Sequence, residues 1–392
     1  MTRLFQKNRV ARRALTAAGA ALTLSVGSFA APLMAAALAP APHTELVYVG
    51  TLQKQIGALR LDTSSGALTA IGPVASGPKS TWVSASPTLP VLYAVDDDST
   101  KEGSITAYAV DRDNGSLGKI NSVLTGGRGT TFLRVDPRSA TVFGANYNSG
   151  SVSSVAINPD GSVGALVSTI EETGSGPNRR QASAHAHAVA IDPSGRYALV
   201  PDLGADRVFV YRFDRATHAL AQDDTTRAHS YVAPPGSGPR HLEFGANGQF
   251  VYLLTELSAE VIVFRWDAAQ GTLTQVQSLP ISSDGFAGVK SGAEIALSHD
   301  GRFVYVENRG ENSLVVYRVN PHTGELSLLQ RVSSGGEKPW GFGIDATGKW
   351  LLVANQRSGK VTVFGIDTES GTLSDTGQAA ELADPTSIAF VQ

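Results

Sequence analysis

The sequence predicts an all-β fold, a seven-bladed β-propeller closed into a ring, and three observations support this prediction. Short apolar segments recur along the chain with a spacing of about 50 residues. Each segment is rich in Val, Ile, Leu, Phe and Tyr and is bounded by turns that contain Gly, Pro, Asp or Asn. None of the repeated units shows the spacing of apolar residues that is typical of an amphipathic helix. A strand-only repeat of this length is typical of propeller blades.

The repeat is clearest in the second half of the chain. Four copies carry a turn glycine, and their spacings are 53, 53 and 47 residues: Gly195, Gly248, Gly301 and Gly348. Weaker copies use a turn proline, at Pro87 and Pro137, which are 50 residues apart, and Pro193 follows 56 residues later in the copy that contains Gly195.

The number of blades follows from the apolar run after each turn. Seven such runs are present: Leu46–Gly50, Val91–Val95, Thr141–Ala145, Tyr197–Pro201, Phe250–Leu254, Phe303–Glu307 and Trp350–Ala354. The first run lacks a preceding strand, whereas the final segment, Pro385–Val391, lacks a partner. We therefore expect Pro385–Val391 to be the innermost strand of the N-terminal blade, which closes the ring and hides exposed strand edges. Residues 44–392 then form one domain.

The first 43 residues have the order of a secretory signal peptide. Met1–Arg13 is basic, Ala14–Ala31 is weakly apolar, and Ala35–Ala37 offers small residues to a peptidase. We interpret residues 1–37 as a signal peptide and residues 38–43 as a linker, with Ser28–Ala30 as an alternative cleavage site. An uncleaved anchor is the competing interpretation, but Ala, Gly, Ser and Thr make a poor membrane span. The expected mature protein is periplasmic or secreted, without a stable membrane anchor.

The adjacent Arg12 and Arg13 resemble a twin-arginine export signal. They also contribute to the uneven charge of the chain. The chain has a formal net charge of −3, yet residues 1–43 hold five basic residues and no acid. Residues 44–392 therefore hold 27 basic and 35 acidic residues, which argues against nucleic acid as a partner. The absence of cysteine excludes thiol nucleophiles, disulfides and Cys-ligated metals.

Candidate functional residues follow from propeller geometry. Residues before an inner strand and residues after a second strand meet on the same face, near the axis. The first position supplies His185, His187, Arg240, Glu294 and Trp340, and the second supplies Asn146, Glu256, Asn308, Arg309 and Gln356. Structural roles compete with functional ones here, because a buried Arg often ties neighbouring carbonyl groups together. His185 and His187 have metal-ligand spacing but no clear carboxylate partner, so we expect no metal and no cofactor.

Several segments carry a resemblance to a known family: Gly174–Gln181, His185–His187, Asp202–Val208 with Tyr211–Arg212, Gly236–His241, Thr255–Leu257, Asn308–Gly310 and Val353–Gln356. Together they resemble the lactonase family of seven-bladed propellers, whose namesake activity is that of 6-phosphogluconolactonase. The resemblance spans residues 44–392 and implies catalytic roles for His187, Arg240, Glu256 and Arg309. Ala184, Glu243 and Trp340 depart from the family pattern, and the last two, which lie near the expected channel, leave the identity of the substrate open.

The resulting hypothesis is an exported lactonase that hydrolyses a sugar-derived lactone, phosphorylated or not. Lactone opening needs an activated water, a stabilised oxyanion and protonation of the ring oxygen. We expect His187 to be the base, Arg240 and Arg309 to hold the anion, and Glu256 to orient His187 or donate a proton. We expect the protein to be a monomer or a weak homodimer. We expect its binding partner to be the small-molecule lactone substrate.

Three other functions remain open at this point. The first is a non-catalytic exported propeller that binds a sugar, a peptide or an envelope component, because one fold hosts many functions. The second is a muconate-type cyclase that forms lactones. The third is a metal-dependent gluconolactonase.

Overall fold

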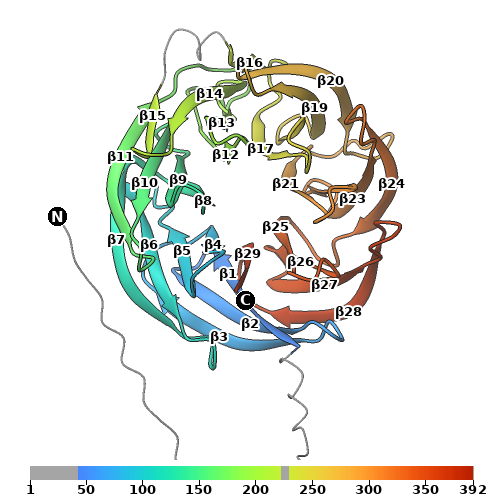
Figure 1. Ribbon diagram of the computed structural model, residues 1–392. Coiled ribbons are helices and arrows are strands. Elements are labelled where there is room, and N and C mark those ends of the chain that lie inside the picture. Colours follow the sequence, from blue (N-terminus) through green and yellow to red (C-terminus); the bar gives the residue numbers. More distant parts are fainter. Residues whose placement is uncertain (1–42, 222–228, 392) are drawn as a thin grey trace, which may run out of the picture. The chain divides into compact units, whose positions relative to one another are not determined.

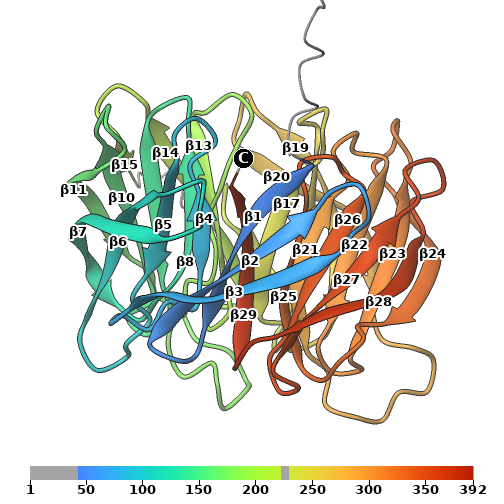
Figure 2. The same ribbon diagram turned by 90° about the horizontal axis from the view of Figure 1, so that it is seen from below.

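The computed structural model describes residues 43–221 and 229–391, which form the seven-bladed ring that the repeat predicts (Figure 1). Seven antiparallel sheets, each containing a run of four paired strands, surround a central axis, and Figure 2 shows the ring from the side. The predicted signal peptide and all of the linker except His43 lie outside the described residues. Among the described residues, we find no helix with the length and apolar character needed to cross a membrane.

The strands of the first three sheets, written from the axis outward, are as follows: β29 (Pro385–Val391), β1 (Thr44–Thr51), β2 (Gln55–Asp62) and β3 (Leu68–Ser76); β4 (Val83–Ala85), β5 (Val91–Val95), β6 (Glu102–Val110) and β7 (Leu117–Arg128); β8 (Thr130–Asp136), β9 (Thr141–Asn146), β10 (Ser151–Ile157) and β11 (Val163–Glu171). The fourth sheet holds β12 (Ala190–Ile191), β13 (Tyr197–Asp202), β14 (Arg207–Asp214) and β15 (Ala219–Ala221), with β16 (Tyr231–Val232) also paired to β14.

The remaining three sheets follow the same order: β17 (Pro239–Phe244), β18 (Phe250–Thr255), β19 (Glu260–Asp267) and β20 (Thr272–Pro280); β21 (Gly292–Leu297), β22 (Phe303–Asn308), β23 (Ser313–Val319) and β24 (Leu326–Ser333); β25 (Pro339–Ile344), β26 (Trp350–Asn355), β27 (Lys360–Ile366) and β28 (Leu373–Glu381).

The C-terminal strand closes the ring, as the unpaired first and last segments predict. β29 pairs antiparallel with β1, from Leu46 opposite Val391 to Thr51 opposite Pro385. It thereby becomes the innermost strand of a sheet whose other members come from the N-terminal end of the described chain. All seven predicted second-strand runs are confirmed as β1, β5, β9, β13, β18, β22 and β26.

The burial of each strand explains the composition of the repeat. Second strands lie between neighbouring sheets, so both of their faces are buried, and their sequences are almost continuously apolar. Outer strands have one exposed face and alternate accordingly, as in β11. The hydrophobic core therefore consists of layers between adjacent blades, one of which packs Phe303 and Tyr305 of β22 against Phe364 of β27.

Hydrogen bonds from buried tyrosines join several neighbouring blades. The hydroxyl of Tyr305 in β22 donates to the carbonyl oxygen of Gly371 at 3.1 Å, in the turn between β27 and β28. Tyr48 makes the equivalent bond to Gly115 at 2.9 Å. Gly371 has a φ of +81°, and a Cβ there would collide with the ring of Phe303. Glycine is therefore required both by the turn and by the close approach of the next blade.

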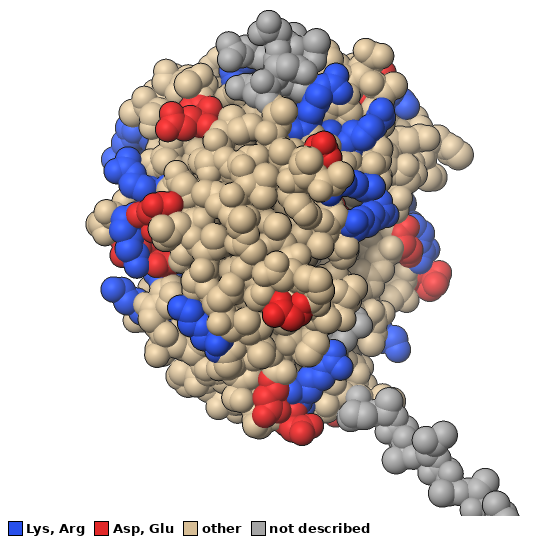
Figure 3. Space-filling view, turned by 60° about the vertical axis from the view of Figure 1, so that its left-hand side comes forward, with Lys and Arg blue, Asp and Glu red and all other residues tan. Residues whose placement is uncertain are grey.

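The outer surface carries charges of both signs. Figure 3 shows the side on which β7 and β11 lie, where Lys and Arg alternate with Asp and Glu across a largely uncharged surface. No continuous patch of one sign is visible on this side.

We expect Tyr305→Phe to lower the free energy of unfolding by about 1 kcal/mol, because the buried Gly371 carbonyl loses its donor. Tyr231→Phe is the matched control, since its hydroxyl bonds Gln275 at an exposed position, and we expect a change below about 0.5 kcal/mol. Thermal unfolding of both variants measures the difference. Equal losses in the two variants would contradict the role of the blade-to-blade bond.

Candidate active site

A cavity of about 580 Å³ lies on one face of the ring, where second strands end and inner strands begin. Its walls come from six of the seven blades and from the segments between them. We call it the basic cavity, and its lining residues are Lys79, Asp97, Ser99, Thr131, Tyr147, Asn148, Arg180, His187, Arg240, Glu256, Ser291, Arg309, Lys338 and Trp340.

Glu256 is the central charge of the basic cavity. It directly follows β18 and is only 2% exposed. Its carboxylate lies 3.1 Å from Nε of Arg240 and 2.9 Å from Nη2 of Arg309, and Nη1 of Arg180 also contacts it. Burial alone would raise the pKa of Glu256, but Arg309, Arg240 and Arg180 outweigh burial and hold the pKa far below its ordinary value. Glu256 is therefore an anion at neutral pH, which favours orientation over proton donation.

His187 lies beside this carboxylate, with Nε2 3.8 Å from Oε2 of Glu256. Its backbone N–H donates to the carbonyl oxygen of Pro201 at 3.0 Å, which fixes the residue against β13. Burial, followed by the positive charge of Arg240 and the nearby His241, lowers the pKa of His187 well below its ordinary value. The imidazole is therefore neutral at pH 7, and a neutral imidazole is the form that accepts a proton.

The lining of the basic cavity has an excess of positive charge. Five basic residues face two acids, Asp97 and Glu256, although the chain as a whole is acidic. Trp340 forms a platform for two of these cations, with Arg309 4.8 Å and Lys338 5.1 Å from its ring centre. A low-dielectric cleft of one sign concentrates small ligands of the opposite sign. This arrangement suits a polar, negatively charged ligand.

The structure brings five of the ten predicted site residues together in the basic cavity: His187, Arg240, Glu256, Arg309 and Trp340. His185 lies behind the cavity wall, where its ring stacks on Tyr147 at 4.5 Å and its Nδ1 bonds the Tyr147 carbonyl oxygen at 2.8 Å. It therefore supports a lining residue without lining the cavity itself.

The other four predicted residues also lie outside the basic cavity. Asn146 bonds the hydroxyls of Thr130, Ser151 and Ser153 in its own blade. Asn308 accepts the backbone N–H groups of Gly310 and Glu311 in the turn after β22, and Gln356 bonds Asp384. Glu294 is 7% exposed and faces the opposite part of the axis.

Nine lining residues lie outside the predicted set, and three of them, Arg180, Tyr147 and Lys338, have polar or charged groups close to the Glu256 cluster or to Trp340. Arg180 comes from the long segment between β11 and β12, so the rule that selects residues next to the ends of inner and second strands, here called the strand-end rule, does not reach it. It does lie within Gly174–Gln181, one of the segments that resemble the family. Tyr147 is adjacent to Asn146, and its hydroxyl bonds Arg180 at 3.0 Å. Lys338 directly precedes the inner strand β25, so it occupies one of the positions from which the candidate residues were selected.

The described residues contain no group of three or more His, Asp or Glu side chains arranged to hold a metal ion. The functional groups in the basic cavity are instead a neutral imidazole, a buried carboxylate and a set of basic side chains. Fold and cavity together define a seven-bladed β-propeller with a polar, largely basic cavity at its axis.

Comparisons with known proteins identify the family. The model of the family described as "Lactonase, 7-bladed beta-propeller" matches residues 46–390. A 6-phosphogluconolactonase from Bacillus subtilis is 32% identical over 348 residues, which cover 88% of this chain and 97% of that protein. The structure of a periplasmic gluconolactonase from Pseudomonas aeruginosa has 34% identity and a TM-score of 0.82, covering 89% of this chain and 99% of that one. The chain belongs to the lactonase family of seven-bladed β-propellers, and it is a lactonase-type hydrolase, the class that opens cyclic esters.

We expect Glu256→Gln to destabilise the fold by about 3–5 kcal/mol at pH 7, because three buried or partly buried arginines lose their counter-charge. The folded pKa of Glu256 is depressed, so its stabilising effect is present above the unfolded pKa of about 4.3. The difference between wild type and variant therefore shrinks as the pH falls from about 4.3 toward the folded pKa. Denaturant unfolding at several pH values measures it.

Glu381→Gln, on the exposed face of β28, is the control and should leave stability unchanged at every pH. A constant difference between wild type and Glu256→Gln across the acidic range would show that the ionised carboxylate is not the source of stability.

Proposed function

We propose that this lactonase hydrolyses a sugar-derived lactone that carries a negatively charged group. One observation carries the proposal: a neutral His187 and the Glu256 carboxylate with its three arginines face a single cavity whose lining is predominantly basic. Sugar lactones are small and polar, and a cavity of about 580 Å³ accommodates one. The names of the relatives support the choice, because they include 6-phosphogluconolactonases and a gluconolactonase.

His187 is the proposed general base. Its neutral imidazole takes a proton from water while the water oxygen attacks the lactone carbonyl carbon. The same proton then passes from the imidazolium to the ring oxygen as the carbon–oxygen bond of the ring breaks. Glu256, 3.8 Å away, stabilises the transient imidazolium and remains ionised throughout.

The three arginines differ in how far they can reach a ligand. The side chain of Arg180 is 42% exposed and that of Arg309 is 10% exposed, whereas that of Arg240 is 2% exposed. Arg240 also donates to the carbonyl oxygen of Ala293, so its guanidinium group is already hydrogen-bonded to protein groups. We therefore assign the substrate anion and the developing oxyanion to Arg309 and Arg180, and assign Arg240 to the positioning of Glu256.

We also propose that the mature protein is exported to the periplasm or beyond. The basic, apolar and small-residue order of residues 1–37 supports this, and one structurally similar relative is a periplasmic gluconolactonase. Fractionation of cells that express the full chain, with N-terminal sequencing of the mature protein, tests this part of the proposal.

We expect purified wild-type protein to accelerate the opening of 6-phosphogluconolactone more than that of uncharged gluconolactone, and we expect His187→Ala to lower kcat about 10²–10⁴-fold with little change in KM. Arg309→Ala should also raise KM, because it removes a contact to the bound anion, and Arg309→Lys should restore little because an ammonium lacks the planar fork. His322→Ala, in an exposed turn, is the matched histidine control. Lactone disappearance in buffered solution gives both constants.

A wild-type protein inactive on both lactones but active on muconates or muconolactones would replace this reaction by the cyclase chemistry. Ligand binding without turnover of any lactone would favour the non-catalytic propeller. If His187→Ala kept its turnover while folding normally, the base would have to be another residue.

The pH dependence of kcat/KM should reflect the depressed pKa of His187. A base acts only when deprotonated, so the rate falls as the pH drops through its pKa. Because that pKa lies well below 6.5, we expect kcat/KM to stay level from about pH 8 through 6.5 and to decline only at lower pH. Initial rates corrected for spontaneous hydrolysis give the profile. An inflection at or above pH 6.5 would contradict the assignment.

A further inference from the structure

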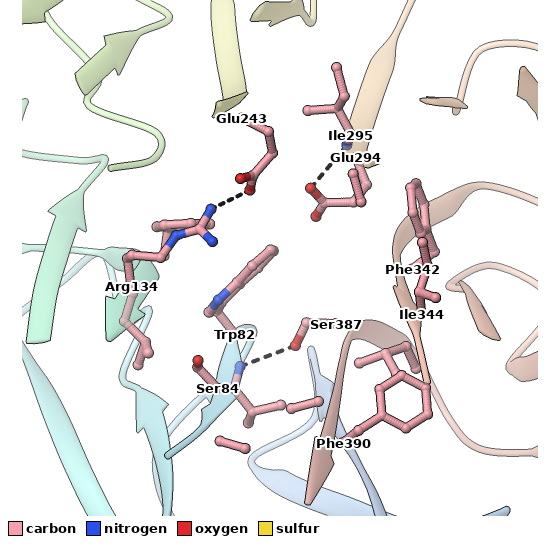
Figure 4. Close-up of a pocket in the computed structure, with 17 residues that line it drawn as sticks. Trp82, Ser84, Arg134, Glu243, Glu294, Ile295, Phe342, Ile344, Ser387 and Phe390 are labelled. Carbon is pink, nitrogen blue, oxygen red and sulfur yellow. Dashed lines mark hydrogen bonds and ion pairs between the residues drawn. The ribbon is translucent and has the colours of Figure 1, made fainter. Parts of the chain in front are cut away.

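A second cavity, of about 360 Å³, occupies another part of the ring axis (Figure 4). Its walls lie further along the same inner strands, and it shares no lining residue with the basic cavity. Figure 4 shows Trp82, Phe342 and Phe390 around it, together with the charged side chains of Arg134, Glu243 and Glu294.

Aromatic rings separate the two cavities. Trp82 and Phe132 lie 4.5 Å apart between ring centres, and the ring of His241 lies 5.3 Å and 5.1 Å from them. His241 in turn packs against His187 at 5.2 Å. These rings therefore pack between residues that line the two cavities. The second cavity is accessible to solvent, because the side chains of Arg134 and Glu243 are 36% and 28% exposed.

Glu294 presents an unpaired carboxylate oxygen at the second cavity. Its Oε1 accepts from Nδ1 of His241 at 2.8 Å and from the backbone N–H of Ile295 at 3.0 Å. Its Oε2 is buried and has no hydrogen-bond donor among the described residues, and the residue as a whole is only 7% exposed. In Figure 4 the carboxyl group points into the cavity. Buried carboxylate oxygens are normally hydrogen-bonded, so a donor is missing at this position.

The remaining charges of the second cavity leave an excess of negative charge. Arg134 forms an ion pair with Glu243 and lies over the ring of Phe132, 5.6 Å from its centre. That pair is neutral as a unit, which leaves Glu294 as the uncompensated charge among the lining residues. Aromatic faces attract cations as well, and Trp82, Phe342 and Phe390 offer three. The second cavity thus prefers charge of the opposite sign to that preferred by the basic cavity.

We propose that the second cavity is a binding site for a small organic ammonium ion with an apolar body. Its N–H group donates to Oε2 of Glu294, and its body packs against Trp82, Phe342 and Phe390. The cavity volume lies in the range of small-molecule sites, with mostly apolar walls and a few polar groups that fix orientation. The inference is independent of the lactone chosen above.

The test uses 2-phenylethylammonium as the probe and the neutral 2-phenylethanol as its isostere. Burial raises the pKa of Glu294 to about 7, so titrations are run near pH 8, where both the carboxylate and the ammonium are ionised. We expect the ammonium to bind wild-type protein at least about tenfold more tightly than the alcohol, because hydrogen bonds to charged groups are worth that factor or more. Glu294→Gln should remove this preference, and Glu381→Gln should retain it.

Calorimetric titration gives the affinities, and circular dichroism establishes that each variant is folded. Phe390→Ala provides a second test that leaves the carboxylate in place, and we expect it to weaken both probes. Crystals of the wild-type protein soaked in a bromine-substituted 2-phenylethylammonium locate the ligand, and this test does not depend on the folding of any variant. Equal affinity for ammonium and alcohol, unchanged affinity in folded Glu294→Gln, or bromine in the basic cavity would each overturn the proposal.

Discussion

The pairing of β29 with β1 is the constraint on which the rest of the molecule depends. It joins strands from opposite ends of the described chain and gives the first blade its inner strand, so that seven inner strands surround one axis. Both cavities are lined from several blades at once. Glu256 meets Arg180, Arg240 and Arg309 only because the segments that carry them face one axis at fixed angles.

The same arginines set the properties of two neighbouring groups. They keep Glu256 ionised although it is buried, and the charge of Arg240 helps to keep His187 neutral. Glu294 forms no ion pair with an arginine among the described residues, so burial outweighs the weaker effects of Arg240 and Arg134 and raises its pKa to about 7. Two carboxyl groups near one axis thus have opposite shifts, and the number of close arginines accounts for the difference. This division gives the basic cavity a fixed anion and a proton acceptor at neutral pH.

Much of the fold could be predicted from the sequence, because the repeat, the turn residues and the buried second strands are local patterns. The site could be predicted only in part. The position of Asn146 and Asn308 after second strands predicts that both residues lie near the axis. Their short side chains nevertheless form hydrogen bonds within their own blades and do not line the basic cavity. Arg180 escaped the strand-end rule because it lies in a long segment between blades. Arg240 and Arg309 look alike in sequence and both line the basic cavity, and only their burial supports the proposed division into a positioning residue and a ligand-binding residue.

The ring wall of Trp82, Phe132 and His241 also has a kinetic consequence. It lies between two cavities that share no lining residue. If lactone hydrolysis takes place in the basic cavity as proposed, the opened hydroxy acid leaves by the mouth through which the next lactone enters. Because that acid bears a new carboxylate, which the basic lining attracts, the proposal implies that product and substrate compete for the same place.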